Sequence, residues 1–230
     1  MRKIIIAIDG PAGSGKTSSA KILAEKLNYV YIDTGAMYRA VTLAWLQKKK
    51  EHNLELNDEV IKKILANSKI ELKTSEKGQI TLLNGVDVSE EIRSAEVNKY
   101  VSPISANEIV RTSLVEMQRE LGSGKCCVMD GRDIGTTVFP NAELKIYLTA
   151  TIGARAKRRM LEYEQKGIKD LSFDEIAEQI TARDIYDSNR KVSPLRKAED
   201  AFEINTSDMT LEEQVEVIYS KAIELINENF

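Results

Sequence analysis

The stretch of sequence that decides the fold is Gly10-Pro11-Ala12-Gly13-Ser14-Gly15-Lys16-Thr17. It matches G-x-x-x-x-G-K-[ST], the pattern of a phosphate-binding P-loop. The apolar run 3–8 before it predicts a buried strand. Behind it, apolar residues recur at helical spacing and predict a helix, at Ala20, Leu23, Ala24 and Leu27. Strand, glycine loop and helix follow one another in the order that a P-loop requires.

Each part of this loop has a task in binding a nucleoside triphosphate. Glycines let backbone N–H groups turn inward around an anion, and the helix N-terminus adds its positive dipole end. Lys16 is placed to reach the β- and γ-phosphates, and the Thr17 hydroxyl to ligate Mg²⁺. The alternatives are an ordinary glycine-rich turn, which the strand, the spacing, Lys16 and Thr17 all oppose, and a dinucleotide fingerprint, whose glycine spacing differs.

Composition narrows the class of protein. The chain has 230 residues, enough for one α/β domain with insertions, and its net charge of −3 gives no global field for nucleic acid or anionic membrane. The adjacent Cys126 and Cys127 lie in an apolar run, which predicts small core residues in a reducing cytosol. The only histidine, His52, lies in a polar run, which disfavours a His-based triad or metal site. The N-terminus lacks a signal-peptide layout and no apolar run approaches about 20 residues, so we expect a cytoplasmic protein.

The rest of the chain alternates strands and helices. Further buried strands are predicted at 29–32, 125–129, 144–148 and 202–204, and helices at 36–50, 57–65, 95–105, 107–121, 152–166, 173–188 and 211–227. Asn57 and Ser172 are expected to cap their helices, and Gly122 to occupy a helix C′ position. The alternation predicts an α/β fold with a parallel five-stranded sheet and helices on both faces. Ligands are then expected at the carboxyl ends of the strands.

One segment has a different pattern. Short strand-like pieces at 70–73, 80–83 and 86–88, with Asn84-Gly85 between the last two, predict a small inserted antiparallel sheet. From the residues alone, a surface hairpin and a role beside the substrate are equally open.

Polar clusters follow the predicted strands. In Asp130-Gly131-Arg132-Asp133, an Asp closes an apolar strand as a Walker B carboxylate does, and Arg132 suits a phosphate. The alternative is a loop with an internal ion pair. The stretch Thr34–Arg39 brings a Thr, a Tyr and an Arg to a second strand–helix junction, where they could hold a second phosphate.

Two more clusters lie on predicted helices. Arg155, Arg158 and Arg159 share a helix face and favour a phosphate site over a solvated surface. Arg183, Asp187 and Arg190 share another face, where intrahelical salt bridges are an equal alternative. Many arginines, one P-loop and almost no histidine favour phosphoryl transfer between two phosphorylated molecules, because that chemistry needs positioning and charge neutralisation. A GTPase is disfavoured because no N-K-x-D occurs, and a DNA-translocating ATPase because a broad basic surface is expected of it.

Over nearly its whole length the chain resembles the bacterial cytidylate kinases, a family of nucleoside monophosphate kinases. The stretches that carry the resemblance are 8–16, 33–39, 130–136, 158–160 and 183–190. The resemblance implies a P-loop NTPase fold and transfer of the ATP γ-phosphoryl group to CMP or dCMP, with Mg²⁺. It also implies that the inserted sheet belongs to an enlarged monophosphate-binding region.

The resemblance also assigns the site residues. Gly10, Pro11, Ala12, Gly13, Ser14, Gly15, Lys16, Thr17 and Ser18 would bind ATP. The acceptor CMP would contact Thr34, Tyr38, Arg39, Ser102, Arg111, Asp130, Arg132, Asp133, Arg183, Asp187 and Arg190. Among these, Ser102, Arg111 and Asp133 would read the cytosine edge, and Arg183 with Asp187 the ribose. A mobile lid would carry Arg155, Arg158 and Arg159 over ATP.

The expected organisation is a single kinase domain: a core of 1–34, 105–150 and 191–230, a monophosphate-binding region of 35–104 and a helical lid of 151–190. Tyr186 stands where some relatives have a further Arg, which puts one lid contact in doubt. The expected partners are small nucleotides, without nucleic acid or membrane, and the expected state is a monomer. A kinase for UMP or dephospho-coenzyme A, and a non-catalytic ATP-binding module, remain as alternatives.

Overall fold

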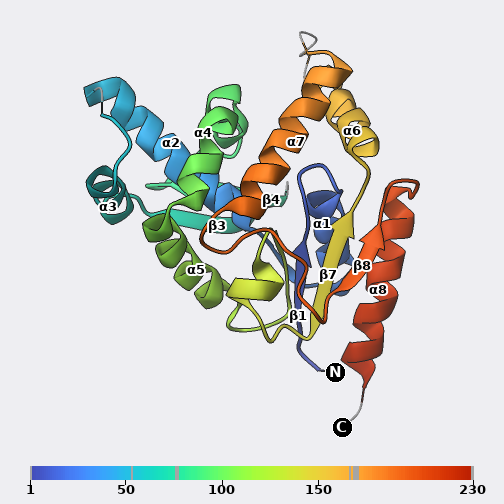
Figure 1. The fold of residues 1–230 in the computed structure, drawn as a ribbon. Helices are drawn as coiled ribbons and strands as arrows, with labels where there is room; N and C mark the ends of the chain where they lie inside the picture. The colour runs from blue at the N-terminus through green and yellow to red at the C-terminus, as the bar shows by residue number, and fades with distance from the viewer. Residues whose placement is uncertain (1, 53, 76–77, 166, 168–170, 229–230) are drawn as a thin grey trace. The chain divides into compact units, whose positions relative to one another are not determined.

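The computed structural model describes residues 2–52, 54–75, 78–165, 167 and 171–228 (Figure 1). The chain divides into two compact units, one of residues 1–31 and 124–230 and the other of residues 32–123. Each unit has its own core. Among the described residues, no helix is long and apolar enough to cross a membrane.

The first unit contains the P-loop and the C-terminal half of the chain. Its elements are β1 (Ile5–Asp9), α1 (Lys16–Leu27), β6 (Cys127–Gly131), the π-helical turn η2 (Ile134–Val138), β7 (Leu144–Thr149), α6 (Ile152–Gln165), α7 (Phe173–Asn189), β8 (Phe202–Asn205) and α8 (Leu211–Asn227). Strand β2 (Val30–Asp33) leads from this unit into the second.

A five-stranded sheet in the order β2-β6-β1-β7-β8 confirms the predicted architecture. Strand β1 lies in the centre and pairs in parallel with β6 and β7, with Ile8 opposite Asp130 on one side and Ile146 on the other. All five residues of β1 are buried, as expected of a central strand covered on both faces. This register brings the ends of β1 and β6, and therefore the P-loop and Asp130, to one edge of the sheet.

Helices α1 and α8 pack on one face of this sheet. Ala20, Leu23 and Ala24 of α1 share a buried cluster with Ile218 and Ala222 of α8 and with alternate residues of the strands. Helix α8 has the predicted bounds, and Val215, Ile218 and Ala222 point inward as expected. Helices α6 and α7 pack on each other around a smaller cluster of Ala156, Ile176 and Ile180.

The second unit is mostly helical. Its elements are α2 (Thr34–His52), α3 (Asp58–Ala66), β3 (Ile70–Ser75), β4 (Gly78–Leu83), β5 (Val86–Asp87), the 3₁₀ turn η1 (Glu91–Arg93), α4 (Ala95–Ala106) and α5 (Glu108–Gly122). Its core is lined by α2, α3, α4 and α5 around residues such as Met37, Trp45 and Leu114. The three-stranded antiparallel sheet β3-β4-β5 confirms the predicted insertion.

Local signals in the sequence explain several element boundaries. Asn84 and Gly85 both have positive φ, which the tight turn between β4 and β5 requires. Asn57 caps α3, since its side chain accepts from the Val60 N–H, and Ser172 caps α7 within a capping box. The cap predictions are therefore confirmed.

Other boundaries differ from the predictions. Gly122 is the last residue of α5 and Ser123 follows in right-handed helical conformation, so the predicted glycine C′ cap is wrong. Strand β6 begins at Cys127, because Lys125 and Cys126 have φ values of 56° and 53°, which a strand does not accommodate. Cys127 is a buried free thiol as predicted, whereas Cys126 is only half-buried.

Candidate active site

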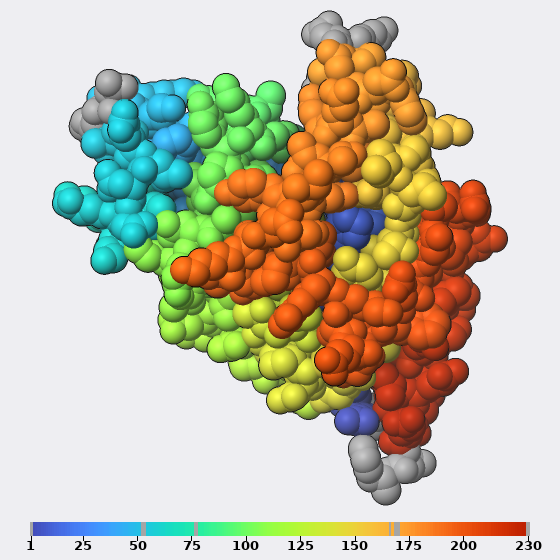
Figure 2. All heavy atoms as spheres, viewed as in Figure 1, coloured from blue at the N-terminus to red at the C-terminus, as the bar shows by residue number. Residues whose placement is uncertain are grey.

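The P-loop leaves the buried end of β1 and enters α1 through a tight turn. Gly10 has a φ of 147°, and a Cβ there would lie 2.1 Å from the Leu148 carbonyl oxygen, so a side chain is excluded. Gly15, directly before α1, has a φ of 94°, and a Cβ there would lie 2.6 Å from Oε1 of Gln214 on α8. The neighbouring strand and helix therefore require glycine at both ends of the loop. In Figure 2, the N-terminal segment is visible in blue within a hollow between the yellow and orange segments.

Lys16 is buried at the start of α1. Its Nζ donates to the Pro11 carbonyl over 2.6 Å and to Ser14 Oγ over 3.3 Å. Burial lowers the pKa of Lys16 well below its usual value, and the charge of Arg132 lowers it further. Among the described residues, the Lys16 ammonium donates to a carbonyl and a hydroxyl, so a bound polyphosphate would stabilise its charged form.

Thr17 and Asp130 are in direct contact. The Thr17 hydroxyl donates to Asp130 Oδ2 over 2.8 Å, and the Tyr31 hydroxyl donates to Asp130 Oδ1 over the same distance. Strand β6 places the carboxylate, and the first turn of α1 places the hydroxyl. A hydroxyl and a carboxylate side by side beside a phosphate loop are oxygen ligands of the type that Mg²⁺ prefers.

The three predicted lid arginines have different surroundings. Arg155 is buried and donates to the carbonyls of Ala150 and Ala12, over 3.0 Å and 3.1 Å, and to Asp184. Arg158 donates to Gly13 and to Thr206. Arg159 instead pairs with Glu162 on its own helix, 3.2 Å away. Two of these side chains thus contact the backbone of the P-loop in this structure.

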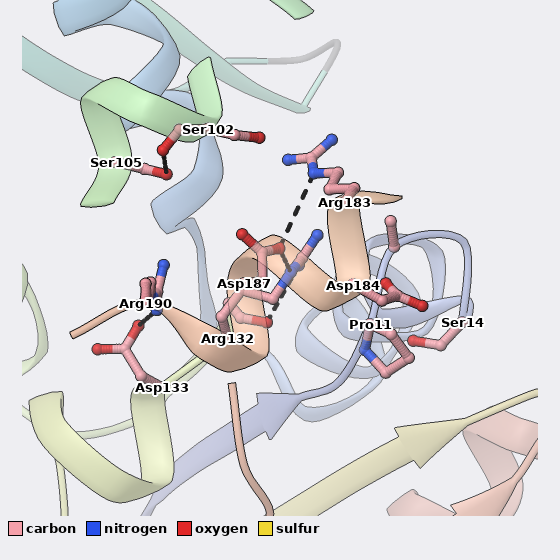
Figure 3. Close-up of polar contacts among 12 residues, drawn as sticks. Pro11, Ser14, Ser102, Ser105, Arg132, Asp133, Arg183, Asp184, Asp187 and Arg190 are labelled. Atoms are coloured by element: carbon pink, nitrogen blue, oxygen red, sulfur yellow. Dashed lines mark hydrogen bonds and ion pairs between the residues drawn. The ribbon is translucent and has the colours of Figure 1, made fainter. Parts of the chain in front are cut away.

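Asp187 on α7 lies between two arginines (Figure 3). Arg132 Nε lies 3.0 Å from its Oδ2 and Arg183 Nε 3.9 Å from the same oxygen. Burial by itself would raise the pKa of Asp187, but the charges of Arg132, Arg183 and Arg190 outweigh it and lower that pKa. Burial also lowers the pKa of Arg183 to about 10. The structure thus joins two of the sequence clusters into one charged group.

Arg190 pairs with a carboxylate that lies outside its own helix. It lies at the C-cap of α7, and its Nη2 lies 3.3 Å from Asp133 Oδ1 while its Nε donates to the Ser193 carbonyl (Figure 3). Both side chains of this pair are buried. The first unit therefore holds Arg132, Asp133, Arg183, Asp187 and Arg190 in fixed pairs.

Sequence reasoning missed Asp9, the last residue of β1. Its carboxylate accepts from the backbone N–H groups of Ile134 and Gly135, over 2.8 Å and 2.7 Å, and so holds η2 beside Asp133. Burial raises the pKa of Asp9 to about 7, against the effect of these two donors. The sequence shows that Asp9 directly precedes the P-loop. It does not show the partners of Asp9, because they lie about 125 residues further along the chain.

In the second unit, Arg111 on α5 is almost completely buried. Its Nη1 donates to the Ser105 carbonyl over 3.1 Å, and its guanidinium carbon lies 5.2 Å from the centre of the Tyr38 ring. Ser105 Oγ in turn donates to the Ser102 carbonyl (Figure 3). Within this unit, Arg111, Ser102 and Tyr38 therefore belong to one connected group.

Arg39 on α2 is held by the segment around η1. Its Nη1 donates to the Ile92 carbonyl over 3.1 Å and to Asn98 Oδ1 over 2.6 Å. Thr34, the first residue of α2, is buried. Asp33, for which no role was predicted, accepts from the Ala36 N–H and pairs with Arg93, both over 3.0 Å.

The central parallel strand, the glycine loop and the lysine at the start of the following helix define the class of the protein, which is that of the P-loop nucleotide-binding proteins. The model of the family described as cytidylate kinase matches residues 6–224. The chain belongs to the cytidylate kinase family.

Curated relatives agree. A cytidylate kinase of Bacillus subtilis (strain 168) is 49% identical over 218 residues, which cover 94% of this chain and 95% of that protein. A cytidylate kinase of Bacillus velezensis is 48% identical over 228 residues, covering 99% of this chain and 98% of that protein. The likeness therefore includes both compact units and not the P-loop alone.

Proposed function

We propose that this protein transfers the γ-phosphoryl group of ATP to CMP or dCMP, giving ADP and CDP or dCDP. The observation that carries the proposal is an intact P-loop, with Lys16 and Thr17, in a chain that matches the cytidylate kinase family from residue 6 to residue 224. The curated relatives are named cytidylate kinases, and this chain matches almost the whole length of each of them.

Phosphoryl transfer between two nucleotides requires the protein to hold two groups of phosphates close together. The electrostatic repulsion between them has to be offset, and the attacking and leaving oxygens have to lie in line. On the donor side, inward N–H groups of the loop and the Lys16 ammonium bind the β- and γ-phosphates. On the acceptor side, Tyr38, Arg39 and Arg132 bind the CMP phosphate, with Thr34 nearby.

The residues at the loop fit a bound Mg²⁺. Thr17 Oγ1 and Asp130 Oδ2 are adjacent, and the described residues contain no group of three His, Cys, Asp or Glu side chains that could hold a metal by themselves. The phosphates and water would then complete the coordination, as is usual for Mg²⁺. When bound, Mg²⁺ supplies charge neutralisation on the transferred phosphoryl group.

The acceptor base is recognised, in this proposal, by Ser102, Arg111 and Asp133. A carboxylate accepts from the exocyclic amine of cytosine, which uracil lacks, and a guanidinium donates toward N3 and O2. Arg183 and Asp187 contact the ribose, and Arg190 a phosphate. A cytoplasmic location and a monomeric state stay predictions of the sequence.

An assay with alternative acceptors tests the proposal. ADP release is followed by a coupled assay with ATP and Mg²⁺ while CMP, dCMP, UMP or AMP is varied. We expect kcat/KM for CMP and dCMP to exceed that for UMP by about a hundredfold or more, because a site built to hydrogen-bond a group rejects an analogue without it. Equal use of UMP and CMP would contradict the base-recognition residues. ATP binding without turnover of any acceptor would contradict the enzymatic function itself.

A further inference from the structure

The outward side of the P-loop is satisfied by donors from elsewhere in the first unit. When backbone N–H groups turn toward an anion, the carbonyls of the same peptides turn away and need donors behind the loop. Three consecutive carbonyls have such a donor from a distant part of the chain: Ala12 accepts from Arg155 Nη1, Gly13 from Arg158 Nη1 and Ser14 from Thr206 Oγ1. The next carbonyl, that of Gly15, accepts from the Ser19 N–H within α1.

Thr206 is the least expected of these donors. It directly follows β8 and is completely buried. Its hydroxyl oxygen lies 3.0 Å from the Ser14 carbonyl, 3.0 Å from the Thr149 carbonyl and 3.0 Å from Arg158 Nη1. The P-loop, the end of β7 and helix α6 therefore meet at this one side chain.

The number of protons that each group can donate determines the direction of these hydrogen bonds. A hydroxyl has one proton to donate, and Arg158 can only donate, so the Thr206 oxygen accepts from Arg158. The Thr149 carbonyl already accepts from the Thr206 backbone N–H over 2.7 Å. The hydroxyl proton is therefore best used on the Ser14 carbonyl. The Thr206 carbonyl also accepts from Arg158 Nη2, which fixes both ends of the guanidinium.

We propose that Thr206 is a positioning residue of the donor site. Its hydroxyl holds the Ser14 carbonyl outward, which keeps the neighbouring N–H groups directed at the phosphates, and it holds Arg158 against the loop at the same time. The proposal rests on the proposed function, since it assumes that the loop binds ATP. It requires ATP affinity, and not use of the acceptor, to depend on the hydroxyl of residue 206.

Two pairs of variants that differ at the hydroxyl test this inference. Thr206→Val is compared with the wild type, and Thr206→Ala with Thr206→Ser. ATP affinity is measured by calorimetry without acceptor, and KM for ATP and for CMP by the coupled assay. We expect the Kd and KM for ATP to rise about tenfold in each pair when the hydroxyl is lost, with KM for CMP changed less than about twofold. Thr206→Ser should remain close to the wild type.

Thr149→Val is the matched control. Within the described residues, the Thr149 hydroxyl makes a long contact of 3.5 Å with the Ile204 carbonyl, and the substitution keeps the Thr149 backbone carbonyl. An unchanged ATP affinity in both pairs would overturn the proposal, as would equal rises in the KM values for ATP and CMP or a Thr206→Ser variant as weak as Thr206→Ala. The Ser/Ala pair decides the question if Thr206→Val fails to fold. ATP binding without CMP turnover in the wild type would refute the proposed function and leave this test intact.

Discussion

The donor and acceptor halves of the proposed site are built in different ways. The proposed donor half is centred on one continuous stretch, residues 10–18, whose backbone N–H groups are expected to bind the phosphates. The residues proposed for the acceptor half are separate side chains on several elements, and each compact unit contains some of them. Arg111 and Arg39 lie in one unit, and Arg132, Asp187 and Arg190 in the other.

This difference determines how each half responds to mutation. A loop that binds through backbone groups has few side chains whose loss matters, but Lys16 is one of them. A set of separate side chains can be altered one residue at a time, and each change should affect the acceptor alone. The predictions below test this contrast between the halves.

The largest effect is expected from Lys16→Ala. The ammonium group lies within the loop, and its loss removes the charge that follows the phosphates during transfer. We expect kcat to fall on the order of a thousandfold or more, measured by ADP release, with an unchanged circular dichroism spectrum. Lys21→Ala, on the exposed side of the same helix, is the control and should keep full activity.

A smaller and more selective effect is expected from Arg111→Lys. Lysine keeps the charge but loses the planar fork that donates to two atoms at once. We expect KM for CMP to rise between about ten- and a hundredfold, while KM for ATP stays constant. Arg119→Lys, an exposed residue of the same helix, should change neither value. Equal losses for both substrates would show that the two halves are not separable.

Asp187→Asn tests the charged group of the first unit. We expect KM for CMP to rise about tenfold, because Arg132 and Arg183 lose the carboxylate that orients them.

The difference in unfolding free energy between the wild type and the Asp187→Asn variant should also depend on pH. A carboxyl whose pKa is lower in the folded state contributes stability above its unfolded value, here 3.8, and loses it as pH falls through the folded value. The free energy of unfolding should therefore differ most from the wild type near neutral pH, and the difference should shrink below about pH 4. Glu178→Gln, exposed on the same helix, serves as the control. A difference that grows at acid pH would refute the sign of this pKa shift.

The smallest effect is expected from Asn57→Ala, which removes the N-cap of α3 in the second unit. The Asn57 side chain accepts from the Val60 N–H over 2.9 Å, and such a cap contributes about 1 kcal/mol. We expect the melting temperature to fall by about 2–4 °C and the kinetic constants to stay unchanged. Asn57→Asp should retain the stability. A loss of CMP use would show that stability and acceptor binding are coupled within this unit.

The sequence was most informative where the deciding residues are close together. The P-loop, the caps at Asn57 and Ser172 and the turn at Asn84-Gly85 each depend on a few consecutive residues, and the structure confirms the elements that they predicted. Helix α8 has a long apolar periodicity, so its bounds could be predicted to the residue.

Features that depend on distant partners could not be predicted. The π-helical turn η2 exists where Asp9 supplies a carboxylate to two N–H groups, and the pair of Arg190 and Asp133 joins residues far apart in the chain. Thr206 looked like an ordinary residue after a short strand. The proposed cytosine-binding residues could be assigned from a family resemblance but not from their own pattern, because Ser102 and Arg111 have no local signature.

The hydrogen bond between the Val30 N–H and the Cys126 carbonyl has one more consequence. Val30 lies just before the second unit, residues 32–123, and Cys126 lies just after it. The chain therefore enters and leaves this unit at two neighbouring points. Because the two ends lie so close, the part of this segment that follows β2 can change in length without straining the sheet. Variants of this chain with a longer or shorter segment between residues 34 and 123 are therefore expected to keep the fold of the first unit.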